Sequence, residues 1–209
     1  MKIWDLATRL YHWLQAAVFI GLIITGTTAS GPHMQFGLVL FTLVTWRILW
    51  GFCGSETNRF KQFLCSPQVI LTYLRGRSSQ KPGHNPAGGW MVCALLFSLL
   101  LQCISGLALA GLLDQLPLAE WWLTDSVFSL LESTHLLLAD VLPMLVFVHV
   151  MAVICYKLKQ KPLVLAMITG CQSHHSGFKP AYFASSSRAF LVLVAAGLVT
   201  IAIVALSMV

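Results

Sequence analysis

The sequence predicts an all-α membrane protein, in which a bundle of four transmembrane helices is followed by a fifth, C-terminal transmembrane helix. The chain has 209 residues, of which 57% are hydrophobic and 10% are charged, and its mean hydropathy is +0.80. A soluble domain of this size carries about 25% charged residues, so this composition indicates a protein that lies mostly in lipid. The apolar stretches are continuous rather than alternating, which argues against a transmembrane β-barrel.

Five apolar stretches are close to the ~20 residues that a helix needs to cross ~30 Å of hydrocarbon. In chain order they cover residues 10–28, 34–52, 87–112, 135–156 and 189–209. We predict a four-helix core over residues 1–158, a basic cytoplasmic loop over residues 159–188, and the additional helix over residues 189–209. Trp4, Asp5 and His12 are atypical of a cleaved signal peptide, so we expect the first stretch to remain as a transmembrane helix.

Positive charge is confined to one side of the membrane if the five helices alternate in direction. Twelve of the 13 Lys and Arg residues lie before the first stretch, between the second and third, or between the fourth and fifth, and the other, Arg47, lies near the end of the second stretch on the same side. The opposite loops have none, and the longer one carries four acidic residues: Asp114, Glu120, Asp125 and Glu132. The positive-inside rule therefore places the N-terminus in the cytoplasm and the C-terminus outside. Basic cytoplasmic loops account for the net charge of +6, so no nucleic-acid partner is expected.

Four of the seven histidines are predicted to lie at two matched depths. His12 is at the cytoplasmic end of the first stretch and His33 at the outer start of the second. His135 starts the fourth stretch, and His149 follows it by fourteen residues. Fourteen residues make four turns of about 3.5 residues, so this pair shares one helix face, with a separation of roughly 21 Å along the axis. The spacing predicts two stacked sites: His33 with His135 outside, and His12 with His149 inside.

Two imidazoles that face each other across an apolar bundle suit the axial positions of a haem iron. Zinc would need four ligands, commonly including cysteine or carboxylate, and neither depth offers such a set. A single histidine near a helix end often lies simply at the polar boundary. Ionisable residues inside the membrane are costly, however, and they usually have a function. The matched depths therefore favour four haem ligands over four boundary residues.

The same spacing of fourteen residues recurs at two other positions. Gly26 follows His12 at the depth of the outer site, where the missing side chain would leave room for a porphyrin. Arg47 follows His33 at the depth of the inner site, where its guanidinium could pair with haem propionates. Both have simpler alternatives, because glycines let membrane helices pack closely and an arginine can extend to the membrane boundary. Gly37 and Gly106 are weaker candidates for the same clearance.

The fourth stretch contains two further residues whose roles stay open. Asp140 lies five residues after His135 and therefore off the histidine face, so it could contact another helix, lie at the outer boundary or carry a proton. Pro143 lies midway between the two histidines, where it is expected to bend the helix and to serve packing.

Several motifs together resemble the bacterial cytochrome b561 family, which includes the b-type cytochrome subunits of nickel–iron hydrogenases. The resemblance extends over residues 1 to about 158. The motifs are WDLATRLYHW at 4–13, TG at 25–26, WRILWGFCG at 46–54, RF at 59–60 and GHNPAGGWM at 83–91.

The resemblance implies a di-haem core in the bacterial inner membrane, with two non-covalent b-type haems bound by histidine pairs. His12 and His149 would bind the inner haem, and His33 and His135 the outer one. The expected function is electron transfer between the quinone pool and a redox partner, such as a c-type cytochrome, a hydrogenase or another redox protein. Whether the chain is an electron carrier or a subunit of an oxidoreductase stays open at this point.

Three other histidines have alternative interpretations. His84, in the family-like HNP block, could line the inner haem or a quinone pocket, or compete with His12 as a ligand. It could equally be a helix-start residue, because Asn85 can cap a helix and Pro86 fits its first turn. His174 and His175 could bind a metal, although a solvated loop is the simpler interpretation.

Two other functions remain as alternatives. One is a quinone oxidoreductase without a protein partner, acting on a small external redox molecule such as superoxide. The outer loop, which carries Trp121, Trp122 and the four acids, argues instead for docking of a cationic partner. The other alternative is a metal-ion transporter, which would require carboxylates beside the histidines, and only Asp140 is available.

Overall fold

The computed structural model describes residues 1–75, 83, 85–172 and 180–208, and this part of the chain is helical. Five helices are long and apolar enough to cross a membrane, as predicted. They are α1 (Leu6–Thr28), α2 (His33–Cys53), α5 (Pro86–Leu109), α7 (Asp125–Leu158) and α9 (Ser186–Leu206). The prediction of an all-α transmembrane bundle with an additional C-terminal helix is confirmed.

Polar side chains cap the starts of four of these helices, all except α2, at the backbone N–H groups that have no partner within the helix. Asp5 Oδ1 accepts a hydrogen bond from Thr8 N at 2.6 Å before α1, and Asn85 Oδ1 accepts one from Gly88 N at 2.7 Å before α5. Pro86 is the first residue of α5 and Asn85 its cap, as the types of these two residues predict. Ser185 caps α9 in the same way through Arg188 N.

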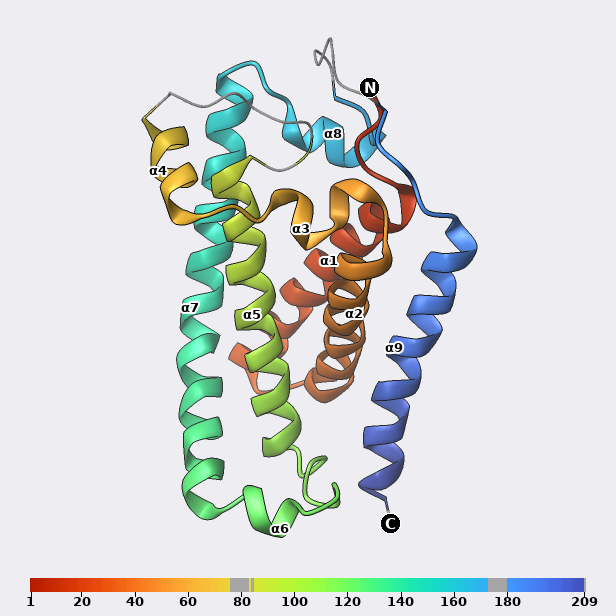
Figure 1. Ribbon diagram of the computed structural model, residues 1–209. Helices are drawn as coiled ribbons and strands as arrows, with labels where there is room; N and C mark the ends of the chain where they lie inside the picture. The colour runs from red at the N-terminus through yellow and green to blue at the C-terminus, as the bar shows by residue number, and fades with distance from the viewer. Residues whose placement is uncertain (76–82, 84, 173–179, 209) are drawn as a thin grey trace.

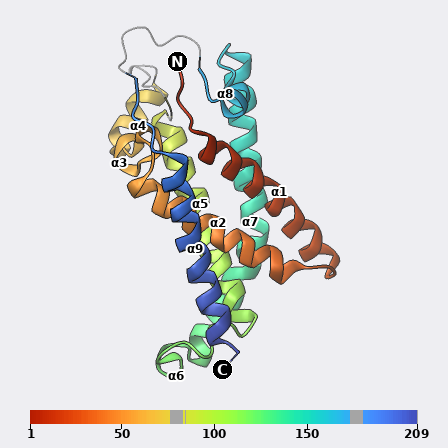
Figure 2. The same ribbon diagram turned by 90° about the vertical axis from the view of Figure 1, so that its right-hand side faces the viewer.

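The first four long helices pack in chain order, α1 on α2, α2 on α5 and α5 on α7, while α9 packs on α2 (Figures 1 and 2). The chain's N-terminus and three short helices lie at one end of the bundle, which we call the N-terminal end: α3 (Phe60–Phe63), α4 (Pro67–Leu74) and α8 (Leu163–Thr169), together with the 3-10 turn η1 (Glu56–Asn58). The opposite end, which we call the α6 end, carries α6 (Ala119–Trp122) and the C-terminus.

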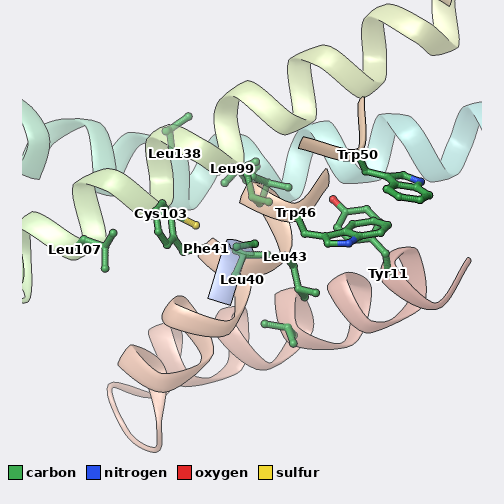
Figure 3. Close-up of a cluster of buried hydrophobic side chains, with 14 of the residues drawn as sticks. Tyr11, Leu40, Phe41, Leu43, Trp46, Trp50, Leu99, Cys103, Leu107 and Leu138 are labelled. Atoms are coloured by element: carbon green, nitrogen blue, oxygen red, sulfur yellow. The ribbon is translucent and has the colours of Figure 1, made fainter. Parts of the chain in front are cut away.

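Buried side chains from α2 and α5 form most of the core between the helices. Near the N-terminal end, Tyr11, Trp46 and Trp50 lie in a row of rings (Figure 3), with Tyr11 and Trp46 centroids 5.1 Å apart and Trp46 and Trp50 centroids 5.4 Å apart. Toward the α6 end the core consists of aliphatic side chains together with Phe41 and Cys103. Trp46 and Trp50 thus lie inside the bundle rather than at its surface.

The helix that carries two of the candidate histidines begins ten residues earlier than the sequence predicts. We predict a fourth span over residues 135–156, whereas α7 is a 34-residue helix from Asp125 to Leu158. Thr124 Oγ1 accepts a hydrogen bond from Val127 N at the start of this helix. The negative charge of Asp125 in the first turn interacts favourably with the positive end of the helix dipole. Residues 125–134 are partly polar, so hydropathy alone assigns them to the loop. His135 is therefore well inside the helix rather than at its start.

The segment after α7 folds back on the N-terminus instead of forming only a loop. The backbone N–H of Ile3 donates to Gly170 O at 2.8 Å, and Gln172 N donates to Met1 O at 2.9 Å. Ile3, Trp4 and Ala166 bury one another in a small separate cluster. The prediction of a basic loop over residues 159–188 therefore missed α8 and its contact with the N-terminus.

Candidate functional site

His33 and His135 line one cavity at the level of the turn between α1 and α2. The cavity has a volume of about 670 Å³ and is lined by residues of α1, α2, α5 and α7. This volume lies within the range of about 300–1,000 Å³ that is usual for ligand pockets. The two imidazoles are within electrostatic range of each other. The structure therefore brings together the two histidines that the sequence predicts at the outer depth.

Four glycines line this cavity, and three of them give clearance in two different ways. A Cβ atom on Gly26 would lie 3.3 Å from His33 Cε1, and one on Gly106 would lie 3.0 Å from His135 Cε1. Each of these glycines therefore makes room for a histidine ring. Gly37 differs, because a Cβ atom there would meet nothing within 4 Å. The open space predicted for Gly26 is thus found more clearly at Gly37.

The residues before two of these glycines hold the histidines, which sequence reasoning missed. Thr25 Oγ1 lies 3.0 Å from His33 Nδ1, and Ser105 Oγ lies 3.1 Å from His135 Nδ1. Gln102 also contacts His135, with its Nε2 3.3 Å from the histidine Nε2. The dipeptides TG at 25–26 and SG at 105–106 share a hydroxyl followed by a glycine, and this repetition is the sequence signal that could have indicated the pair.

Asp140 and Pro143 lie beside the same cavity. Both line it, and Asp140 is exposed on the surface of α7. Asp140 lies off the helix face that carries His135 and His149, as its spacing from His135 predicts, and it therefore lies at the edge of the cavity. Pro143 stands inside α7 between the two histidines.

His12 and His149 lie closer to the N-terminal end, and their imidazoles are within electrostatic range of each other. His12 comes from α1 and His149 from α7. Within the part of the chain that the structure describes, α1 and α7 are not a closely packed pair of helices. His12 Nδ1 is buried and has no hydrogen-bond partner there. A buried polar atom without a partner is uncommon, and it marks a position where a ligand would complete the contacts.

Arg47 belongs to a buried polar network near this second pair. Its side chain is only 4% exposed, so it does not extend to the membrane surface. Its Nη1 donates to Asn58 O at 3.3 Å, and its guanidinium lies 5.5 Å from the centre of the Phe60 ring. Asn58 Nδ2 in turn donates to Asp5 Oδ2 at 2.9 Å. The network joins the start of α1 to α2 and to η1.

The remaining histidines lie where the structure gives no description. His84, His174 and His175 are outside the described residues, so their predicted roles stay predictions. Over residues 1–75, 83, 85–172 and 180–208, no group of three or more His, Cys, Asp or Glu side chains could hold a metal ion. The described histidines thus form pairs, which fit an iron that already has a planar four-nitrogen ligand better than a metal that needs four protein ligands.

The residues present fit a haem at both places. At the α6 end there are a cavity, two histidines from different helices and open space at Gly37. At the N-terminal end there are two histidines on helices that are not closely packed, together with a buried arginine that could bind a carboxylate. Apolar walls from four helices surround the first site and would exclude water from it.

The comparisons with known proteins identify the family. The model of the prokaryotic cytochrome b561 family matches residues 3–170. The match includes all four core helices and also α8, and it ends before α9. Comparisons with curated proteins and with solved structures gave no significant match. The chain belongs to the prokaryotic cytochrome b561 family and is a multi-pass membrane b-type cytochrome of electron transfer.

Proposed function

We propose that the protein holds two b-type haems and transfers electrons along its bundle between the quinone pool and a redox partner. The observation that carries this proposal is the arrangement of α7. His135 on this helix faces the site that contains His33, and His149, fourteen residues further on, is within electrostatic range of His12. Both partner histidines come from the hairpin of α1 and α2.

The residues of each site have distinct tasks in this proposal. His33 and His135 would hold one haem at the cavity, and His12 and His149 would hold the other. A bound b-type haem supplies a one-electron couple between ferric and ferrous iron. Two histidines per haem would leave the iron no open coordination position, which would favour electron transfer over the binding of oxygen. Arg47 would neutralise a propionate near His12, and the apolar walls keep water away from the cavity.

The distribution of charge supports an orientation in the bacterial inner membrane. Basic residues lie at the N-terminal end, in the N-terminal segment, around η1, α3 and α4, and after α7. The loop at the α6 end carries acids and no Lys or Arg, and Trp121 there is 82% exposed. The positive-inside rule favours a cytoplasmic N-terminal end, with the α6 end available to a basic redox protein such as a c-type cytochrome.

The first experiment measures haem in the purified protein. We expect a reduced-minus-oxidised spectrum of b-type haem and two haems per chain by the pyridine haemochrome assay. His135→Ala and His149→Ala should each reduce the content to one haem, and the two variants should lose different redox components. A colourless protein that binds zinc in place of haem would overturn the proposal.

A second experiment tests the partners. Protein reduced by a soluble quinol analogue should be reoxidised by a cationic cytochrome c, at a rate that falls as salt screens the acidic loop. Glu120→Gln should weaken this salt dependence, and Ser129→Ala, on the same side of the protein, serves as its control. Reoxidation at a rate independent of salt would argue for the alternative of a small external redox molecule.

A further inference from the structure

The two histidines of the cavity share a supporting arrangement that is built twice from different helices. On α1, Thr25 Oγ1 lies 3.0 Å from His33 Nδ1, and Gly26 leaves room for the His33 ring. On α5, Ser105 Oγ lies 3.1 Å from His135 Nδ1, and Gly106 leaves room for the His135 ring. In both cases a hydroxyl–glycine dipeptide of one helix meets the histidine of the next transmembrane helix along the chain.

The direction of these hydrogen bonds follows from the other contacts of the hydroxyls. A hydroxyl has one hydrogen to donate and two lone pairs that accept. Thr25 Oγ1 donates to Gly21 O at 2.8 Å, and Ser105 Oγ donates to Leu101 O at 2.8 Å. With its hydrogen used in this way, each hydroxyl oxygen accepts from the histidine. His33 and His135 therefore carry their hydrogen on Nδ1, and each Nε2 has the lone pair that a metal needs. At His135 this lone pair faces the Gln102 amide, with Gln102 Nε2 3.3 Å away, so the amide would have to turn aside when a metal binds.

Local bonding alone does not account for the arrangement. Serine and threonine hydroxyls in helices often bond to the carbonyl four residues earlier, and Thr27 and Ser133 do so at exposed positions. Thr25 and Ser105 differ because they are 8% and 0% exposed and each also reaches a histidine. Gln102 O lies 3.2 Å from His135 Nδ1 and offers a second acceptor to the same hydrogen.

We propose that Thr25 and Ser105 are positioning residues that fix the tautomer and the ring orientation of His33 and His135, so that both Nε2 atoms are available to one iron. This inference rests on the proposed function, because it assumes that these two histidines bind a haem. Acceptors on the second ring nitrogen are a common feature of metal-binding histidines, and they raise the basicity of the ligand. A more basic ligand stabilises ferric iron, so the two hydroxyls lower the reduction potential at this site.

The test uses the full-length protein with Thr25→Val, Ser105→Ala and the double variant. Transfer of haem to excess apomyoglobin and equilibrium redox titration are the readouts. We expect the double variant to bind one of its two haems about 10- to 100-fold more weakly. Each single variant should raise the midpoint potential of that same component, although Thr25 and Ser105 lie on different helices. The other component should be unchanged.

The controls separate positioning from general stability. Thr72→Val and Ser133→Ala remove hydroxyls that bond to their own helices and do not line the cavity, and they should leave both potentials unchanged. Thr25→Ser and Ser105→Thr keep an acceptor and should restore the wild-type potential. Ser105→Ala removes a single oxygen atom, so it carries the test if Thr25→Val does not accumulate.

Two outcomes distinguish this inference from the proposed function. If His33→Ala and His135→Ala both retain two haems, the proposed ligands are wrong and this inference falls with them. If each of those variants loses one haem while the double hydroxyl variant matches Ser133→Ala in affinity and potential, only the role of Thr25 and Ser105 is overturned.

Discussion

The two histidine pairs of the bundle have different kinds of neighbouring side chains. At the cavity, the neighbours of His33 and His135 are hydroxyls and glycines that belong to the membrane helices themselves. Near His12 and His149, the neighbours include a buried arginine network to which η1 and the residue before α1 contribute. The first pair is thus oriented by hydrogen bonds between helices. The second lies near charge that is buried by segments outside the main helices.

If each pair holds a haem, as proposed, this difference would place two similar groups in unlike environments. Hydrogen bonds to ligand nitrogens and nearby charges are separate ways to tune a redox centre. The hydroxyls beside His33 and His135 favour the oxidised state of a bound iron, whereas a cation such as Arg47 favours the reduced state of a neighbouring centre. On this basis we expect the lower potential at the cavity.

His12→Ala should remove the haem of the N-terminal end completely and leave the cavity site intact. His12 is the histidine of α1 that interacts with His149. Alanine at position 12 would leave His149 without its proposed partner ligand. The pyridine haemochrome assay should give one haem per chain, with one redox component lost. His84→Ala is the matched variant, and it should retain two haems. If His84→Ala loses a haem and His12→Ala does not, the two histidines exchange roles.

Gly37→Phe should exclude the haem of the cavity without unfolding the protein. A Cβ atom at Gly37 meets nothing within 4 Å, so the ring would enter the open space rather than clash with a helix. We expect one haem per chain, with the potential of the remaining component unchanged. Gly197→Phe is the control, because Gly197 on α9 also has open space but does not line the cavity. Two haems in Gly37→Phe would show that this space is not used.

The five transmembrane spans and the two histidine pairs could be predicted from the sequence, because they depend on the helical period and on the depth of each residue in the membrane. The five spans follow from hydropathy, and the pairing of His135 with His33 and of His149 with His12 follows from the four-turn spacing along one helix. In the structure His33 and His135 line one cavity, and His12 and His149 interact electrostatically, while their pairing as haem ligands stays a prediction. Such features survive errors of several residues in helix boundaries, as the early start of α7 shows.

The supporting contacts could not be predicted because they depend on how each helix is rotated. Thr25 and His33 are eight residues apart across a turn, and Ser105 and His135 are thirty residues apart across the loop at the α6 end. A small rotation of either helix would separate the hydroxyl from the ring. The contact of Ile3 with Gly170 is a backbone hydrogen bond, and no side-chain pattern in the sequence records it.

Arg47→Met should weaken the N-terminal end while leaving the cavity unchanged. The variant removes the donor to Asn58 O and a charge near His12, and a hydrogen bond from a charged group contributes about 1.5–3 kcal/mol. We expect lower thermal stability and a lower potential for the component that His12→Ala removes. Arg47→Lys keeps the charge without the planar fork and should restore the potential more fully than the stability.

Arg59→Met provides the control for this charge. Arg59 Nε donates to Gly54 O at 2.9 Å, and its guanidinium lies 5.7 Å from the centre of the Tyr182 ring, so it is held in the same part of the protein. It should change neither potential. Equal shifts of both redox components in Arg47→Met would indicate a general loss of structure rather than a local charge effect.

Thr42→Val should have the smallest effect, because Thr42 acts on the attachment of α9. Trp46 also contacts α9, but its ring is stacked in the core between Tyr11 and Trp50, so Trp46→Phe should lower stability more. Trp46 Nε1 donates to Ala189 O at 3.0 Å near the start of α9, and Thr42 Oγ1 lies 2.7 Å from Thr200 Oγ1 further along it. Each hydrogen bond contributes about 0.5–1.5 kcal/mol, so thermal unfolding of Thr42→Val in detergent should shift slightly while haem content and both potentials stay constant. The family match ends at residue 170, before α9, which supports a role for this helix outside the electron path. Loss of a haem in Thr42→Val, which changes shape very little, would instead make α9 part of a cofactor site.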